Sequence, residues 1–179
     1  MKLFTLGPTE MYPRTLELAG KPLPYFRTGE FSDVISETCD LMRRFANAPD
    51  GSEVVILTAS GTAAMEASVV NCFDRDDKLL VVDGGTFGHR FAEICAYHRI
   101  PFESVDLPFG VEFAEDKLRA FENKGFTGLL INIHETSTGQ LYDMDIVGEF
   151  CRRNGLYLVA DAIGSFLADE TDMRRCGID

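Results

Sequence analysis

Short apolar segments alternate with amphipathic ones from residue 53 to the end of the sequence. The apolar segments are rich in β-branched residues and predict strands over residues 53–57, 78–83, 102–107, 127–133 and 156–161. The stretches between them have helical spacing and predict helices over residues 60–73, 88–98, 114–123 and 145–154. This alternation predicts an α/β fold with a mostly parallel sheet covered on both faces.

Residues 1–50 follow a different pattern. Glycines and prolines, among them Gly7, Pro8 and Pro13, predict an extended arm before a helix over residues 31–48. The sequence therefore predicts an N-terminal arm and helix over residues 1–50 and a partial large domain over residues 51–179. At the other end, Gly177 is expected to stop a helix and Ile178 to begin another strand. The sheet is therefore expected to be incomplete at the C-terminus.

Composition and charge argue against several classes of partner. The 179 residues contain 17 Lys and Arg against 29 Asp and Glu, a formal net charge of −12. This balance disfavours a nucleic-acid partner and an anionic membrane surface. No apolar run approaches the ~20 residues of a membrane span and no signal peptide is evident, so a cytoplasmic protein is expected. The five cysteines and three histidines are scattered, so neither disulfides nor a metal site is expected.

Candidate chemistry gathers at the carboxyl ends of the predicted strands, where ligands bind in open parallel sheets. After the first predicted strand, Ser60, Gly61 and Thr62 open a helix whose free backbone N–H groups can bind a phosphate. A plain N-cap by Ser60 is an equally good interpretation. Because the turn carries neither a Walker lysine nor a GxGxxG fingerprint, an unrelated nucleotide-binding protein is disfavoured.

Glycines flank Phe87 after the second predicted strand. They can expose the aromatic ring to a flat ligand, although a core position for Phe87 is the simpler interpretation in isolation. His89 is interpreted as a surface or capping residue, because nothing nearby in the sequence would orient it as a base.

Polar residues also follow the fourth and fifth predicted strands. Thr136 lies in a hydroxyl-rich turn, a composition that ordinary loops share, and Asp161 is either a cap or a functional anion. A phosphate-binding turn, an aromatic ring and a carboxylate together fit pyridoxal 5′-phosphate (PLP). A carboxylate keeps the ring nitrogen of PLP protonated, so that the ring can serve as an electron sink.

The sequence resembles the class V, fold-type I PLP-dependent aminotransferases, particularly the alanine/serine–glyoxylate and 2-aminoethylphosphonate–pyruvate branches. The resemblance runs from residues 6–9 through residues 25–31 to residues 177–179. It implies the large domain of the PLP-dependent transferase fold and a homodimer.

The resemblance also implies roles for individual residues. Those that would bind the cofactor are Ser60, Gly61 and Thr62 in the phosphate-binding turn, Phe87 stacked on the pyridine ring, Thr136 close to the ring, and Asp161 paired with the pyridine nitrogen. Gly7 and Pro8 resemble the segment that borders the substrate pocket, although a simple turn is the alternative.

The Schiff-base lysine of this family is absent. It would lie beyond Asp179, whereas every lysine of this sequence precedes Asp161: Lys2, Lys21, Lys78, Lys117 and Lys124. The sequence therefore predicts the N-terminal part of an enzyme that moves an amino group from an amino acid or aminophosphonate to a 2-oxo acid. Activity would require a lysine-bearing segment, either from a complementing chain or from a longer version of this one.

The alternative is a catalytically inactive interaction module that retains the fold. In both cases the sheet edge at Ile178 is expected to make the isolated chain aggregate or pair with a complement.

Overall fold

A computed structural model describes residues 2–3, 5 and 7–179. Leu6, at the start of the N-terminal motif, lies outside the described residues. The chain divides into two compact units, Met1–Met42 and Arg43–Asp179. The boundary at residue 50 between the N-terminal arm with its helix and the partial large domain stays a prediction.

The N-terminal unit contains one helix that the sequence pattern predicts and one that it does not. Helix α2 (Gly29–Phe45) begins where the backbone N–H of Phe31 donates to Thr28 Oγ1 at 3.3 Å. Helix α1 (Pro13–Ala19) occupies part of the predicted extended arm. Its proline lies in the first turn, where no N–H is required, so the residue that appeared to break the chain instead starts a helix.

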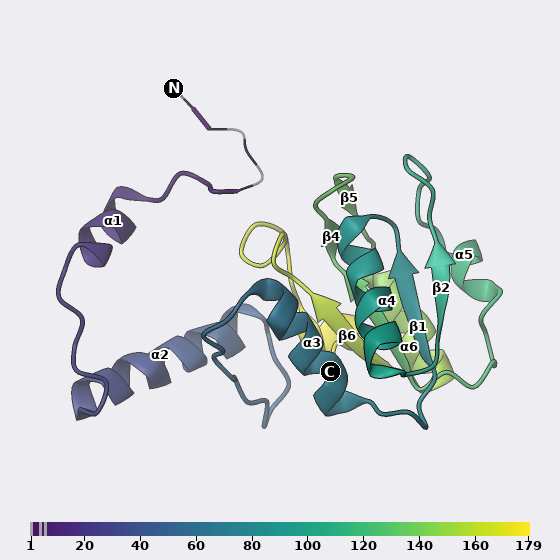
Figure 1. Ribbon diagram of the computed structural model, residues 1–179, viewed down its shortest axis with the longest axis horizontal. Helices are drawn as coiled ribbons and strands as arrows, with labels where there is room; N and C mark the ends of the chain where they lie inside the picture. The colour runs from purple at the N-terminus through teal and green to yellow at the C-terminus, as the bar shows by residue number, and fades with distance from the viewer. Residues whose placement is uncertain (1, 4, 6) are drawn as a thin grey trace. The chain divides into compact units, whose positions relative to one another are not determined.

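Four parallel strands form the sheet in the order β2-β1-β3-β6 (Figure 1). Their bounds are β1 (Leu79–Asp83), β2 (Phe102–Asp106), β3 (Gly128–Asn132) and β6 (Tyr157–Asp161). A short antiparallel hairpin follows β3 and was not predicted: β4 (His134–Glu135) and β5 (Gln140–Leu141). The helices of this unit are α3 (Gly61–Cys72), α4 (Thr86–His98), α5 (Glu115–Arg119), α6 (Met144–Asn154) and α7 (Met173–Cys176).

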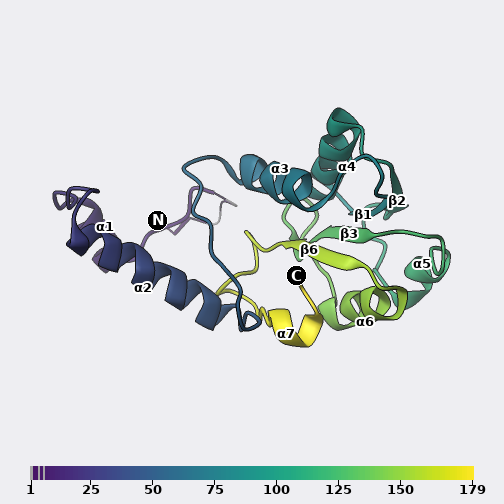
Figure 2. The same cartoon turned by 90° about the horizontal axis from the view of Figure 1, so that it is seen from below.

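Helices cover both faces of the sheet, as predicted. Figure 2 shows α3 and α4 on one side and α5 and α6 on the other. Alternate residues of β3 serve the two cores: Leu129 and Ile131 pack with the α6 residues, and Leu130 packs with the α3 and α4 residues. All three are fully buried, which explains why the strand is a continuous apolar run.

The strand predicted over residues 53–57 is wrong. These residues form no strand, and Val55 and Ile56 are exposed by 78% and 52%. A strand requires a hydrogen-bonded neighbour. Residues 53–57 pair with neither β2 nor β6, the two edge strands of the described sheet. The apolar composition of this segment is therefore not sufficient to place it in the sheet.

The expectations for the end of the sequence are met in part. Gly177 ends α7 in the left-handed conformation, with φ of 66°. Ile178 is buried, and the backbone N–H of Asp179 donates to Leu158 O of β6 at 3.0 Å. The Leu158 N–H in turn donates to Asp179 Oδ2 at 2.9 Å. These two residues thus lie along the edge of β6 without forming a regular strand.

Among the described residues, no helix has both the length and the apolar content that crossing a bilayer requires.

The contact between α6 and α7 yields a stability prediction. A Cβ atom on Gly148 would lie 1.9 Å from the backbone oxygen of Cys176, which cannot be relieved by a side-chain rotation. We expect Gly148→Ala to reduce the free energy of unfolding by about 3 kcal/mol in urea titrations. Gly29→Ala is the matched control, because a Cβ atom there has nothing within 4 Å. Equal stability of the two variants would contradict the described packing.

Candidate functional site

Three neighbouring strands end in polar residues that face α3 and α4. The residue two positions earlier in each strand packs on that side of the sheet: Val81, Leu130 and Val159. Since side chains alternate along a strand, Asp83, Asn132 and Asp161 face the same side at the carboxyl edge. Asn132 and Asp161 are register partners. Asp161, predicted to close a strand, therefore lies at this edge together with Asp83 and Asn132.

A buried carboxylate organises this edge. Glu135 is 0% exposed, and its Oε2 accepts hydrogen bonds from the Gly88 N–H at 2.9 Å and from Asn132 Nδ2 at 3.0 Å. Its Oε1 accepts from the Ser137 hydroxyl at 2.6 Å, from the Ser137 N–H at 3.1 Å and from the Phe87 N–H at 3.4 Å. Burial alone would raise the pKa of Glu135, but these hydrogen bonds outweigh burial and hold the pKa below its ordinary value.

Glu135 and Ser137 together cap α4 from another part of the chain. The N-cap residue Gly85 has no side chain, and the Thr86 N–H donates to Ser137 Oγ at 2.9 Å. A Cβ atom on Gly85 would lie 2.5 Å from Ser137 Oγ, so only glycine permits this approach. Sequence analysis missed Glu135, although a glutamate three residues after a fully buried strand is a usable signal, because buried carboxylates are rare.

The cap sets the position of Phe87 in the first turn of α4. Its side chain is 38% exposed, so the interpretation that it packs into the core is wrong. The ring is therefore available to a ligand at the sheet edge.

Asp161 is a half-buried carboxylate with one hydrogen bond among the described residues. Its Oδ1 accepts from the Ile163 N–H at 3.0 Å. Burial raises the pKa of Asp161, the bond from Ile163 opposes this, and the negative charge of Glu135 raises the pKa further. The net result is a pKa above the ordinary value of an aspartate.

The first turn of α3 approaches the loop that follows Asp161. Ser60 Oγ accepts the Ala63 N–H at 3.2 Å, so the capping interpretation is correct, and it is compatible with anion binding by the other N–H groups. Gly61 and Thr62 are exposed. A Cβ atom on Gly61 would lie 3.3 Å from Ile163 Cδ1, which places this turn close to the loop.

Thr136 approaches the same loop from the β4–β5 hairpin. Its Oγ1 lies 3.4 Å from the position that a Cβ atom on Gly164 would take. Of the predicted site residues, those in the second unit are thus brought to one edge of the sheet. Gly7 and Pro8 belong to the N-terminal unit, where they are exposed and joined by a cis peptide bond.

His89 is exposed, as the surface interpretation predicts, but the reason given for that interpretation requires a correction. Its Nδ1 lies 2.8 Å from Asp83 Oδ2, so a carboxylate does orient the ring. The hydrogen bond to Asp83 and the charge of Asp83 raise the pKa of His89. Sequence analysis missed this pair because the two residues meet only when α4 packs over the end of β1.

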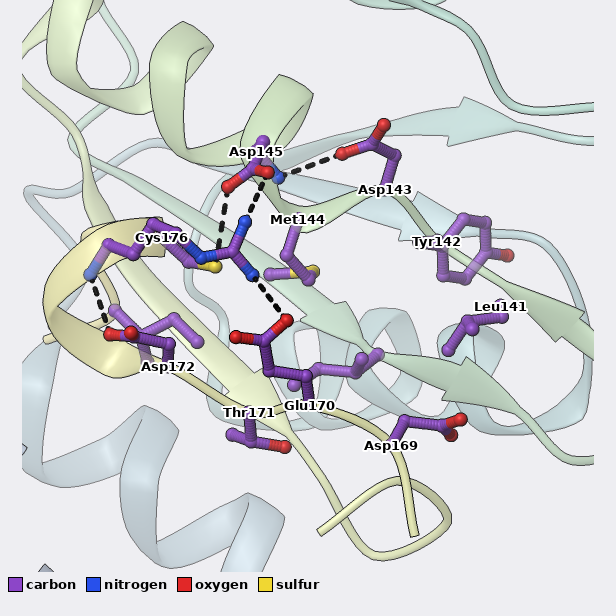
Figure 3. A pocket seen from close by; sticks show the side chains of 13 residues that line it. Leu141, Tyr142, Asp143, Met144, Asp145, Asp169, Glu170, Thr171, Asp172 and Cys176 are labelled. Atoms are coloured by element: carbon purple, nitrogen blue, oxygen red, sulfur yellow. Dashed lines mark hydrogen bonds and ion pairs between the residues drawn. The ribbon is translucent and has the colours of Figure 1, made fainter. Parts of the chain in front are cut away.

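A cavity of about 270 Å³ lies on the α6–α7 side of the sheet (Figure 3). Four of its acidic residues already have partners, and these are Asp143, Asp145, Glu170 and Asp172. Asp143 accepts from the backbone N–H groups of Asp145 and Ile146 at the start of α6. Asp172 accepts from the N–H of Arg175, whose guanidinium pairs with Asp145. Since these groups serve helix ends and an ion pair, this cavity is not the candidate site.

Comparison with known proteins gives a family match and several relatives. The family model described as aminotransferase class-V matches residues 25–179. The 2-aminoethylphosphonate–pyruvate transaminase of Pseudomonas aeruginosa is 30% identical over 152 residues, which cover 84% of this chain and 41% of the transaminase. A protein named soluble hydrogenase, small subunit, from a Synechococcus species is 29% identical over 178 residues, which cover 97% of this chain and 46% of that protein.

A solved structure is similar to nearly the whole of this chain. The aspartate aminotransferase of subgroup IV from Thermus thermophilus is 33% identical with a TM-score of 0.88, and the match covers 97% of this chain and 49% of that one. The chain thus spans about half the length of the relatives it matches.

The raised pKa of Asp161 predicts a variant more stable than the wild type. Asp161→Asn keeps the Oδ1 acceptor for Ile163 but removes a half-buried charge, so we expect a gain on the order of 1 kcal/mol at pH 7. A raised pKa in the folded state costs stability only where the aspartate is ionised. The gain should therefore shrink as the pH falls through the folded pKa and vanish below the ordinary value.

Urea titrations at several pH values measure this gain. Asp106→Asn, at the exposed end of β2, is the matched control and should change stability little at any pH. A pH-independent difference between Asp161→Asn and wild type would contradict the electrostatic explanation.

Proposed function

Because this chain belongs to the class-V aminotransferase family, whose members are PLP-dependent enzymes, we propose that residues 58–165 bind PLP as part of an aminotransferase. The observation that carries the proposal is that Asp161 ends β6 on the side of the sheet that α3 and α4 cover, and that the exposed Phe87 lies in the first turn of α4.

The residues present fit the cofactor. The Asp161 carboxylate is half-buried, and among the described residues only its Oδ1 has a hydrogen-bond partner. A protonated ring nitrogen would supply a partner for the second oxygen and offset the burial that raises the pKa of Asp161. Opposite Asp161, the buried Asn132 Oδ1 also has no partner in the described part of the chain. The ring site is thus lined by acceptors, which suits a group that carries an N–H.

Each chain segment has a separate task in this proposal. The exposed ring of Phe87 would cover one face of the pyridine and exclude water from it. The N–H groups of Gly61 and Thr62 would bind the phosphate at the positive end of α3. The hydroxyl of Thr136 would hydrogen-bond beside the ring.

PLP, when bound, supplies an electron sink for the carbanion formed from an amino-acid substrate. The part of Asp161 is to hold a proton at the ring nitrogen, since a carboxylate stabilises the cationic ring.

Proton transfer at the substrate requires a lysine that this sequence lacks after Asp161. We therefore propose that a lysine-bearing segment, in a second chain or in a longer form of this chain, completes a cytoplasmic homodimeric enzyme. Its substrates would be an amino acid or aminophosphonate and a 2-oxo acid. Gly7 and Pro8 would border the substrate pocket.

Cofactor binding can be tested without the lysine. Deoxypyridoxine phosphate lacks the aldehyde of PLP and binds only noncovalently, so calorimetric titration of the 179-residue chain measures the site itself. We expect Phe87→Ala to weaken binding roughly tenfold through lost stacking, and Asp161→Asn to weaken it at least as much through the lost charge-assisted hydrogen bond. Phe109→Ala is the control, because Phe109 is 81% exposed outside the site. Absence of binding by the wild type would refute the cofactor proposal.

The lysine is tested on the protein from its native source. Borohydride reduction should trap PLP on a lysine, and mass spectrometry identifies the labelled polypeptide. Label on a co-purifying chain or on a longer form of this chain supports the aminotransferase. If analogue binding is normal but no label is found, the inactive interaction module becomes the better description.

A further inference from the structure

Glu135 carries a buried charge with neutral partners. In the described part of the chain its hydrogen-bond donors are backbone N–H groups, the Ser137 hydroxyl and the Asn132 amide, and it forms no ion pair with a Lys, Arg or His. The hydrogen bonds of Glu135 outweigh its burial and hold its pKa below the ordinary value, so the carboxyl is negatively charged at neutral pH. The cap of α4 thus places a fixed negative charge at this edge of the sheet, which a neutral capping residue would not do.

The contacts of Glu135 join the segments that carry the candidate site. One segment is the first turn of α4 with Phe87, reached through the N–H groups of Phe87 and Gly88. A second is the end of β3, reached through Asn132, the register partner of Asp161. The third is the turn after β4, which carries Thr136 and Ser137.

Glu135 also acts on Asp161 through its charge. Among the described residues, Glu135 is the charged group whose negative charge raises the pKa of the Asp161 carboxyl. The other titratable groups around this edge are Asp83, which pairs with His89, the half-buried His134, and Tyr142. Burial, with Glu135 and Asp83, raises the pKa of Tyr142 to about 12, so its phenol stays neutral.

We infer that Glu135 is a positioning residue of the cofactor site: it holds the Phe87 backbone and adds a second negative charge, so that the site favours the N-protonated ring over the neutral ring. The inference rests on the proposed function. In the described chain Asp161 and Glu135 form no ion pair with a Lys or Arg, and His89 is paired with Asp83, so a ring nitrogen is the group that would supply positive charge beside Asp161. Glu135 itself touches neither ring nor substrate and works through Phe87 and Asp161.

The coupling of the two carboxyls can be measured in the ligand-free chain. Carboxyl carbon NMR of ¹³C-labelled Asp and Glu follows both titrations. In Glu135→Gln we expect the Asp161 midpoint to fall, because a neighbouring negative charge is removed. Ser137→Ala, which keeps the charge, and Glu93→Gln, at an exposed position later in α4, should leave it in place. An unchanged Asp161 midpoint in Glu135→Gln overturns the inference.

A second measurement covers the case in which Glu135→Gln does not fold. Asp161→Asn removes the charge of Asp161 and leaves that of Glu135, and it is expected to be more stable than wild type and therefore to fold. With deoxypyridoxine phosphate bound to this variant, we expect the ring nitrogen still to lose its proton at a higher pH than in the free analogue. A bound ring that loses its proton at or below the pH of the free analogue overturns the inference as well.

The ring preference is measured with deoxypyridoxine phosphate, whose ultraviolet spectrum changes when the ring nitrogen loses its proton. We expect the bound ring to deprotonate about one pH unit lower in Glu135→Gln than in wild type, which corresponds to a tenfold change in preference. A purely structural Glu135 would alter affinity and stability but leave this midpoint unchanged. If wild type does not bind the analogue, the proposed function fails, whereas the coupling of Glu135 and Asp161 is judged separately by the ligand-free titrations.

Discussion

The buried carboxylate of Glu135 is the interaction on which the candidate site depends. It satisfies backbone N–H groups at the start of α4 that lack intrahelical partners, and it does so from a hairpin 47 residues further along the chain. Because the same oxygens bind Asn132 and Ser137, the ends of β3, β4 and α4 cannot move independently. The rigid placement of Phe87 relative to the strand ends follows from this shared acceptor.

The candidate site holds an aspartate at a position where its negative charge is unfavourable for folding. Asp161 is half-buried, faces the field of Glu135, and has a raised pKa. Each of these features opposes ionisation in the ligand-free chain and would favour a cationic ligand once it is present. Functional sites commonly hold groups that cost stability in this way, and the well-packed layers on both faces of the sheet supply the stability that offsets the cost.

Family membership and the candidate site rest on different observations. The match to the class-V aminotransferases extends over residues 25–179, whereas the chain spans about half the length of its relatives. In the described sheet, the apolar, β-branched run over residues 53–57 has no strand neighbour. The family thus follows from the sequence match, whereas the candidate site follows from the residues at the carboxyl edge of the described sheet.

The sequence by itself determined the alternation of strands and helices, because burial on one or two faces imposes a periodicity that can be read locally. It also determined which residue types stand at the strand ends, including Asp161. Only the tertiary structure decided that Phe87 is exposed, that Asp83 orients His89, and that residues 53–57 form no strand. Each of these depends on groups brought together by packing, and the partners of Glu135 show the reason: a hydrogen bond between residues 48 positions apart leaves no local pattern.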